Sequence, residues 1–130
     1  MTDTRFTPAH HWVRLLGGVA TVGITGFAQE TLGEVTMVRL PQPGSRVLAG
    51  GACAVIETVK AASDADAPLD GRIIEVNAAV LDAPALMNQD AEGAGWLYRM
   101  APDDPAALDA LMDRVAYDAL LDAMQKAPVG

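Results

Sequence analysis

The sequence predicts a mainly β domain, a β-sandwich or flattened barrel, with helices restricted to one short early segment and to the C-terminal part. Three observations predict this class: short runs rich in β-branched residues, turn residues between those runs, and a helical apolar pattern near the end of the chain. The length of 130 residues suits one unit, so residues 1–130 are expected to form a single domain. Since 51% of the residues are hydrophobic, the chain can fill a core.

The predicted strands are short segments with a high content of valine, isoleucine and threonine. Two breaks between them carry turn residues: Pro41–Gly44 places proline directly before glycine, as in a type II turn, and Pro68–Gly71 ends another connection. Short strands separated by such turns are typical of sandwiches and barrels. The predicted strands cover residues 19–25, 34–40, 52–59, 72–76 and 96–100.

Three segments favour helix. Residues 27–32 are rich in helix-forming side chains, and Gly33 follows them as a residue typical of a helix C-cap. Asp104 before Pro105 is typical of a helix start, with a capping side chain followed by proline at the first helical position. Apolar residues then recur at three- and four-residue steps, so we expect one helix near 105–112 and a longer one near 113–125.

The net charge is −8 and the sequence pI is about 4.4. Such a chain is repelled by phosphate backbones and by anionic membrane surfaces, so neither nucleic acid nor a membrane is an expected partner. No apolar run approaches the ~20 residues that cross a bilayer, and residues 1–5 lack the apolar segment of a secretory signal. These features lead us to expect a cytoplasmic location.

The sequence contains no group of residues typical of a disulfide, a metal site or a catalytic site. The single cysteine excludes an intramolecular disulfide, and no group of cysteines and histidines has the spacing of metal ligands. No motif resembles a nucleophile elbow or another catalytic constellation. We therefore expect neither a metal site nor an enzymatic activity of the chain's own.

Lys60 is a candidate modification site because of its residue type. The chain has two lysines and seven arginines, and Lys60 lies between the strand ending at Val59 and the segment 61–64. An arginine guanidinium stays charged and cannot be acylated under ordinary conditions, whereas a lysine amine can lose its proton and attack an activated acyl group. The alternative is a solvated turn lysine with no further role. The residue type and its place predict a modification site.

The sequence around Lys60 resembles the lipoylation site of the glycine cleavage H proteins. In that family the pattern is Glu-Ser-Val-Lys-Ala with the lysine at a hairpin tip, and here residues 57–61 read ETVKA. Biotinyl carriers and lipoyl domains of 2-oxoacid dehydrogenases have different residues around the lysine. Further matching motifs occur in the family's order over residues 8–122: HHWV (10–13), GITGFAQ (23–29), LGEV (32–35), LP (40–41), VN (76–77), NQD (88–90) and GWL (95–97).

The resemblance implies the barrel-sandwich hybrid fold of lipoyl and biotinyl carriers, with a lipoyl-binding core at about 19–101 and a helical segment at about 104–125. It implies lipoate joined to Lys60 by an amide, in a carrier that shuttles the aminomethyl group of glycine. The implied partners are a pyridoxal-phosphate glycine decarboxylase, a folate-dependent aminomethyltransferase, dihydrolipoyl dehydrogenase and lipoate-attaching enzymes. A monomer is expected.

The resemblance also marks residues that recognise or shelter the arm, and here the sequence departs from the family. Asp64 keeps the acidic position four residues after the lysine, and Glu57 is a candidate for recognition by modifying enzymes. His11 stands where the family carries a glutamate, and Thr31 where some members carry a histidine. The loss of the glutamate is either drift at a tolerant position or the mark of a related carrier serving lipoate transfer or another sulfur chemistry. A separate alternative is an unmodified binding module, which would share the same fold.

Overall fold

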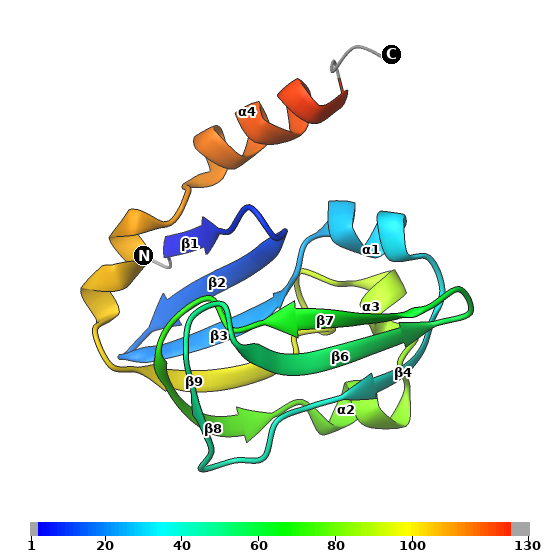
Figure 1. The fold of residues 1–130 in the computed structure, drawn as a ribbon, viewed down its shortest axis with the longest axis horizontal. Helices are drawn as coiled ribbons and strands as arrows, with labels where there is room; N and C mark the ends of the chain where they lie inside the picture. The colour runs from blue at the N-terminus through cyan, green and yellow to red at the C-terminus, as the bar shows by residue number, and fades with distance from the viewer. Residues whose placement is uncertain (1–2, 126–130) are drawn as a thin grey trace.

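The computed structural model describes residues 3–125 and is mainly β, with two antiparallel sheets and short helices (Figure 1). The six-stranded sheet has the order β1-β2-β3-β9-β8-β5, and the three-stranded sheet has the order β4-β6-β7. The larger sheet contains β1 Asp3–Phe6, β2 His11–Leu16, β3 Val19–Ile24, β9 Tyr98–Pro102, β8 Gly71–Val76 and β5 Arg46–Val47. The smaller sheet contains β4 Val35–Arg39, β6 Ala52–Thr58 and β7 Ala62–Asp66.

Side chains from both sheets fill one hydrophobic core. Val22 and Met100 enter it from the larger sheet, and Ile56 and Ala65 enter it from the smaller one, each at most 3% exposed. In Figure 1 the smaller sheet lies in front of the larger one, which is the layered arrangement that the sequence predicts. The core is mostly aliphatic because the chain has few aromatic residues.

The predicted strands are largely confirmed. Those at 19–25, 34–40, 52–59 and 72–76 form β3, β4, β6 and β8, each within one residue of its predicted bounds. The late strand is shifted: β9 begins at Tyr98, because Trp96 belongs to the preceding turn, where its N–H donates to the carbonyl of Gly93. In the predicted turn, Ser45 N–H donates to the Gln42 carbonyl across Pro43 and Gly44, and Gly44 has a φ of 90°.

Four strands were not predicted. Strands β1 and β2 precede residue 19 and continue the larger sheet, so the β structure starts earlier than the predicted core bound. Strand β7 has the sequence ASDAD, whose residue types are poor strand formers. Its pairing with β6 decides its structure, with Ser63 opposite Ile56 and Ala62 opposite Glu57. The short strand β5 pairs only with β8.

Helix α1, Gly26–Leu32, matches the early helix that the sequence predicts. Thr25 caps its first turn by accepting a hydrogen bond from Ala28 N–H. The predicted C-cap is confirmed, because Gly33 has a φ of 85° and its N–H donates to the Gln29 carbonyl. Two further short helices, α2 Ala78–Asp82 and α3 Leu86–Gln89, follow β8.

The predicted helix near 105–112 is present, but it is a 3₁₀ helix and ends two residues before its predicted bound. Pro105–Ala110 forms a 3₁₀ helix, capped by Asp104 as predicted. It stops there because Met112 exchanges two backbone hydrogen bonds with Phe6 at the edge of β1. The later helix is confirmed as α4, Arg114–Gln125. Within residues 3–125 no helix is long and apolar enough to cross a membrane.

A small second cluster ties α4 to the edge of the larger sheet. It contains Phe6 of β1, Trp12 of β2 and Tyr117 of α4, none more than 1% exposed. The rings of Phe6 and Tyr117 stack with centroids 4.6 Å apart. In Figure 1 helix α4 therefore lies beside β1, near the start of α1.

Candidate functional site

Lys60 lies at the tip of the hairpin that joins β6 to β7. The hairpin closes where Thr58 N–H donates to the Ala61 carbonyl, which leaves Val59 and Lys60 as the two tip residues. The Thr58 hydroxyl stabilises the turn, because its Oγ1 accepts hydrogen bonds from the N–H groups of Lys60 and Ala61 and donates to the Ala61 carbonyl. A hydroxyl two residues before the lysine therefore shapes the tip.

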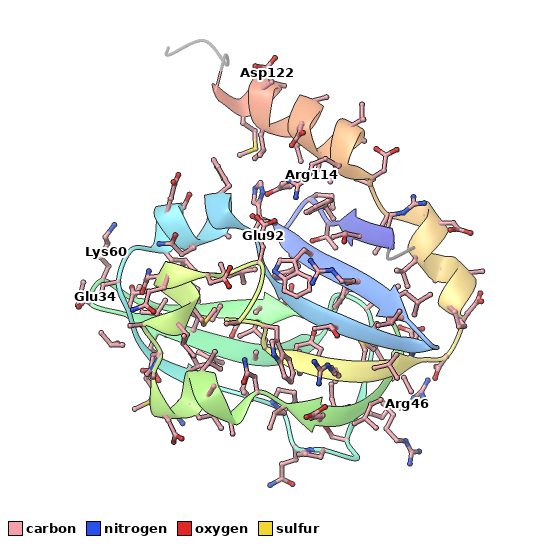
Figure 2. The ribbon with its side chains drawn as sticks, turned by 180° about the vertical axis from the view of Figure 1, so that it is seen from behind. Glu34, Arg46, Lys60, Glu92, Arg114 and Asp122 are labelled. Atoms are coloured by element: carbon pink, nitrogen blue, oxygen red, sulfur yellow. The ribbon has the colours of Figure 1, made fainter. Side chains whose placement is uncertain are left out.

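The side chain of Lys60 is exposed, and Figure 2 shows it pointing away from the body of the molecule. Among the residues that the structure describes, no carboxylate pairs with its amine and no hydrogen bond holds it. The stem passes over Gly33: a Cβ atom on that glycine would lie 3.7 Å from Lys60 Cε and 3.9 Å from Nζ. The amine is thus open to solvent and to an enzyme that approaches the tip.

The chain beneath the lysine is held by Asn88 of α3. Its Oδ1 accepts from Val35 N–H at 2.9 Å, and its Nδ2 donates to the Gly33 carbonyl at 2.8 Å. Asn77 plays a similar part elsewhere, because it caps α2 and donates to two carbonyls of the loop before β9. Both asparagines therefore satisfy backbone groups of neighbouring turns.

Replacing Asn88 by alanine is expected to lower the free energy of unfolding by about 1–3 kcal/mol, because the N–H of buried Val35 and the Gly33 carbonyl lose their partner. Urea unfolding followed by circular dichroism measures the change. The control is Gln89→Ala, since the Gln89 side chain makes no hydrogen bond within residues 3–125. Equal losses in the two variants would contradict this role of Asn88.

A cavity of about 160 Å³ opens between α1, the turn before β2 and the hairpin of Lys60; we call it the α1 cavity. It brings together three of the residues that the sequence marks as arm shelter: His11, Thr31 and Asp64. The residues that line it are Ala9, His10, His11, Ile24, Phe27, Ala28, Thr31, Leu32, Ile56, Ser63, Asp64 and Ala65. Most of this wall is apolar, and its polar groups come from separate segments of the chain.

Glu57 does not line the α1 cavity. It neighbours Ile56, and because side chains alternate along a strand it lies on the opposite face of the smaller sheet. There its carboxylate accepts a hydrogen bond from Arg39 Nε at 3.1 Å. Thr31 lines the cavity, and its hydroxyl donates to the Phe27 carbonyl one turn earlier in α1.

The residues that line the cavity include two histidines and one acidic residue, Asp64, which is exposed and pairs with Val55 across the smaller sheet. Burial lowers the pKa of His10, and burial is also the main reason why the pKa of His11 is lowered, although the charge of Asp66 partly opposes this. Both imidazoles are therefore neutral near pH 7. The lining residues therefore place no fixed positive charge against a cationic group in this cavity.

Sequence reasoning missed several residues of this wall, notably His10, Phe27 and Ile56. His10 shows no acid–base partner in the sequence, and its partner in space is Tyr117, 107 positions later in the chain. Phe27 and Ile56 read as ordinary hydrophobic residues of a helix and a strand. No local pattern distinguishes them, because the cavity forms only where α1, the turn before β2 and the strands β6 and β7 meet.

Known proteins resemble this chain along nearly its whole length. A family model described as glycine cleavage H-protein matches residues 4–124. The glycine cleavage system H protein of Acidiphilium cryptum is 54% identical over 121 residues, covering 93% of this chain and 98% of that protein. The protein of the same name from Parvibaculum lavamentivorans is 46% identical over 125 residues, covering 96% of this chain and all of that protein.

A solved structure shows the same similarity in three dimensions. The crystal structure of a glycine cleavage system H protein from Mycobacterium marinum has a TM-score of 0.84 to this structure and 36% sequence identity. The match covers 92% of this chain and 97% of that chain. The two proteins therefore share the fold over nearly the whole of both chains.

Proposed function

Because this chain belongs to the glycine cleavage H-protein family, we propose that it carries lipoate as an amide on Lys60. Its role is that of a lipoyl carrier in the glycine cleavage system. The modified lysine takes the aminomethyl group of glycine from a pyridoxal-phosphate decarboxylase to a folate-dependent aminomethyltransferase. Dihydrolipoyl dehydrogenase then reoxidises the arm. The protein itself catalyses no step, and it works in the cytoplasm as a monomer.

The main support for this proposal is that the amine of Lys60 is exposed. An amine that is acylated must be reachable by a ligase and must not be held by a carboxylate. Lys60 meets both conditions at the hairpin tip. Acylation removes the positive charge of the side chain, so the modified chain has a net charge one unit more negative than −8.

The α1 cavity fits the other end of the arm. The lysine stem and the acyl chain together reach roughly a dozen Å. Ser63 follows Lys60 by three residues along β7, at roughly 3.3 Å per residue, so the cavity begins within that reach. A cavity of about 160 Å³ is of the size that holds a small ring. The apolar walls provided by Ile24, Phe27 and Leu32 suit a dithiolane.

The bound group supplies a disulfide that accepts the aminomethyl carbon on one sulfur as glycine loses carbon dioxide, and it is left as a dithiol after transfer. The chain's own residues then have two tasks. The hairpin tip presents the arm to each partner, and the α1 cavity keeps the loaded end away from water between partners. Asp64 gives the loaded amine an opposite charge, and the neutral histidines do not repel it.

The function is tested by loading the purified, lipoylated protein with the decarboxylase, glycine and pyridoxal phosphate. Mass spectrometry of the Lys60 peptide is expected to detect the aminomethyl group on the lipoyl arm. Lipoylated protein that takes up no aminomethyl group under conditions that load another family member would eliminate the glycine role. It would favour the alternative of a related carrier for another sulfur chemistry.

Replacing Asp64 by asparagine is expected to shorten the lifetime of the loaded arm about two- to fivefold, because an exposed carboxylate contributes only modestly in water. The measurement is the release of ammonia from the loaded protein without the transferase. The effect should shrink as salt concentration rises. The matched control is Glu57→Gln, which removes a carboxylate of the same sheet that does not line the α1 cavity and is paired with Arg39; a similar loss there would argue against a direct role of Asp64.

A further inference from the structure

His10 has an unusual backbone conformation in the wall of the α1 cavity. Among residues 3–125 it is the only non-glycine residue with a positive φ, at 67°. Its N–H donates to the Thr7 carbonyl at 2.9 Å, and its carbonyl accepts from Thr25 N–H at 3.0 Å. A left-handed histidine costs free energy and persists only where its surroundings hold it, so the chain maintains this ring position against strain.

The ring of His10 is held on two sides. Its centroid lies 4.6 Å from that of Phe27 in α1 and 5.7 Å from that of Tyr117 in α4. Its Nδ1 lies 2.9 Å from the Tyr117 hydroxyl, a hydrogen-bonding distance. The ring is therefore placed by a helix that contributes no residue to the cavity wall.

The Tyr117 hydroxyl also contacts the start of α1. It lies 2.7 Å from Thr25 Oγ1, and that oxygen accepts the capping hydrogen bond from Ala28 N–H. One buried hydroxyl thus joins the turn that carries His10 to the helix that carries Phe27. These two segments form neighbouring parts of the α1 cavity wall, where the His10 and Phe27 rings are in contact.

A second set of contacts, separate from those of the Tyr117 hydroxyl, joins α4 to the start of α1. Glu92 accepts from Gly26 N–H with one carboxylate oxygen and from Arg114 with the other, at 2.8 and 3.1 Å. Figure 2 shows Arg114 of α4 and Glu92 lying near each other at this end of the molecule. Asp118, one turn further along α4, lies 3.7 Å from Arg114. Helix α4 is therefore fastened at the start of α1 independently of the Tyr117 hydroxyl.

We propose that Tyr117 is a positioning residue for the carried group: its hydroxyl fixes the His10 ring in the cavity wall and so slows the escape of the loaded arm. The proposal rests on the proposed function, because it assumes that the arm enters the α1 cavity. It gives α4, a helix outside the cavity, a part in retaining the aminomethyl group. His11, Asp64 and the loaded amine itself are the other titratable groups that face this space.

The test removes the hydroxyl alone. Tyr117→Phe keeps the ring stacked on Phe6, and the Arg114–Glu92 contact holds α4 in place. The matched control is Tyr98→Phe, because Tyr98 is also buried and its hydroxyl, whose neighbour is Cys53, lies outside the α1 cavity and its Tyr117 contacts. Circular dichroism and thermal unfolding verify that both variants are folded.

The first readout needs no lipoyl group. Nitrogen-15 NMR of the His10 ring in the unmodified protein should report one fixed tautomer in the wild type. Tyr117→Phe should move the Nδ1 and Nε2 shifts toward the average of two tautomers, whereas Tyr98→Phe should leave them unchanged. Unchanged His10 shifts in Tyr117→Phe would overturn the proposal, whatever the state of Lys60.

The second readout is the lifetime of the loaded arm without the transferase. Hydrolysis adds water to the protonated S–CH₂–NH₃⁺ group, breaks its C–S and C–N bonds, and gives a thiol, formaldehyde and ammonium. Tyr117→Phe is expected to speed ammonium release about two- to tenfold, the effect of one lost hydrogen bond. In the His10→Ala background the same change should add little, because Tyr117 acts through His10.

The outcomes separate this proposal from the proposed function. Faster release in Tyr117→Phe, absent in Tyr98→Phe and absent in the His10→Ala background, supports the positioning role. A changed His10 tautomer with unchanged release overturns it, as does an equal effect with and without His10. If the lipoylated wild type takes no aminomethyl group, the proposed function has failed and the positioning role falls with it, although the NMR result still reports on the Tyr117–His10 contact.

Discussion

Lys60→Arg is expected to abolish lipoyl attachment and, with it, the support of glycine cleavage. The substitution preserves the positive charge and an exposed side chain at the hairpin tip, so the fold should not change. The guanidinium cannot be acylated at ordinary pH, because it stays protonated and charged. Intact mass spectrometry of the protein from its native host should show a lipoyl-sized addition in the wild type and none in the variant.

The second lysine provides the control. Lys126 lies outside the described residues and far along the sequence from the hairpin, and Lys126→Arg should retain both the addition and the activity in a reconstituted glycine cleavage assay. A wild-type protein without any addition, from a host that lipoylates its other carriers, would favour an unmodified binding module. An addition that persists in Lys60→Arg would move the attachment site elsewhere.

Trp12→Ala is expected to lower the free energy of unfolding by about 3–5 kcal/mol, the largest stability effect that we predict for one substitution. The indole is 1% exposed, and its Nε1–H donates to the Ala91 carbonyl at 3.0 Å. Truncation leaves a cavity beside Phe6 and Tyr117 and removes the partner of that carbonyl. Urea unfolding measures the loss. Leu16→Ala, at a side chain that is 70% exposed, should change stability by less than about 0.5 kcal/mol.

A double mutant with Gly23, the glycine opposite Trp12, tests the packing of the indole directly. Gly23 pairs with Trp12 across β2 and β3, and a Cβ atom there would lie 2.7 Å from three atoms of the indole. Gly23→Ala alone should destabilise the protein by about 1–3 kcal/mol through overpacking. In the Trp12→Ala background most of that cost should vanish, because the clashing ring is gone. Additive losses would show that the two residues do not compete for the same space.

The regular elements were the most predictable part of the fold. Strands β3, β4, β6 and β8 carry β-branched residues and match their predicted bounds to within one residue, because here local preference and tertiary pairing agree. Strand β7 and the end of the 3₁₀ helix were not predictable in the same way. The ASDAD segment becomes a strand only against β6, and Met112 leaves the helical path to pair with Phe6. Both depend on contacts with distant residues.

The candidate site also has a part that the sequence predicts and a part that only the fold decides. The sequence around Lys60 was enough to predict the family and the lysine at the hairpin tip, because acylation depends on the identity of one side chain. The resemblance also named the candidates His11, Thr31 and Asp64. The α1 cavity, the outward position of Glu57 and the bridge from Tyr117 to His10 required the fold. They arise from packing between segments up to 107 positions apart, and no local pattern encodes such a contact.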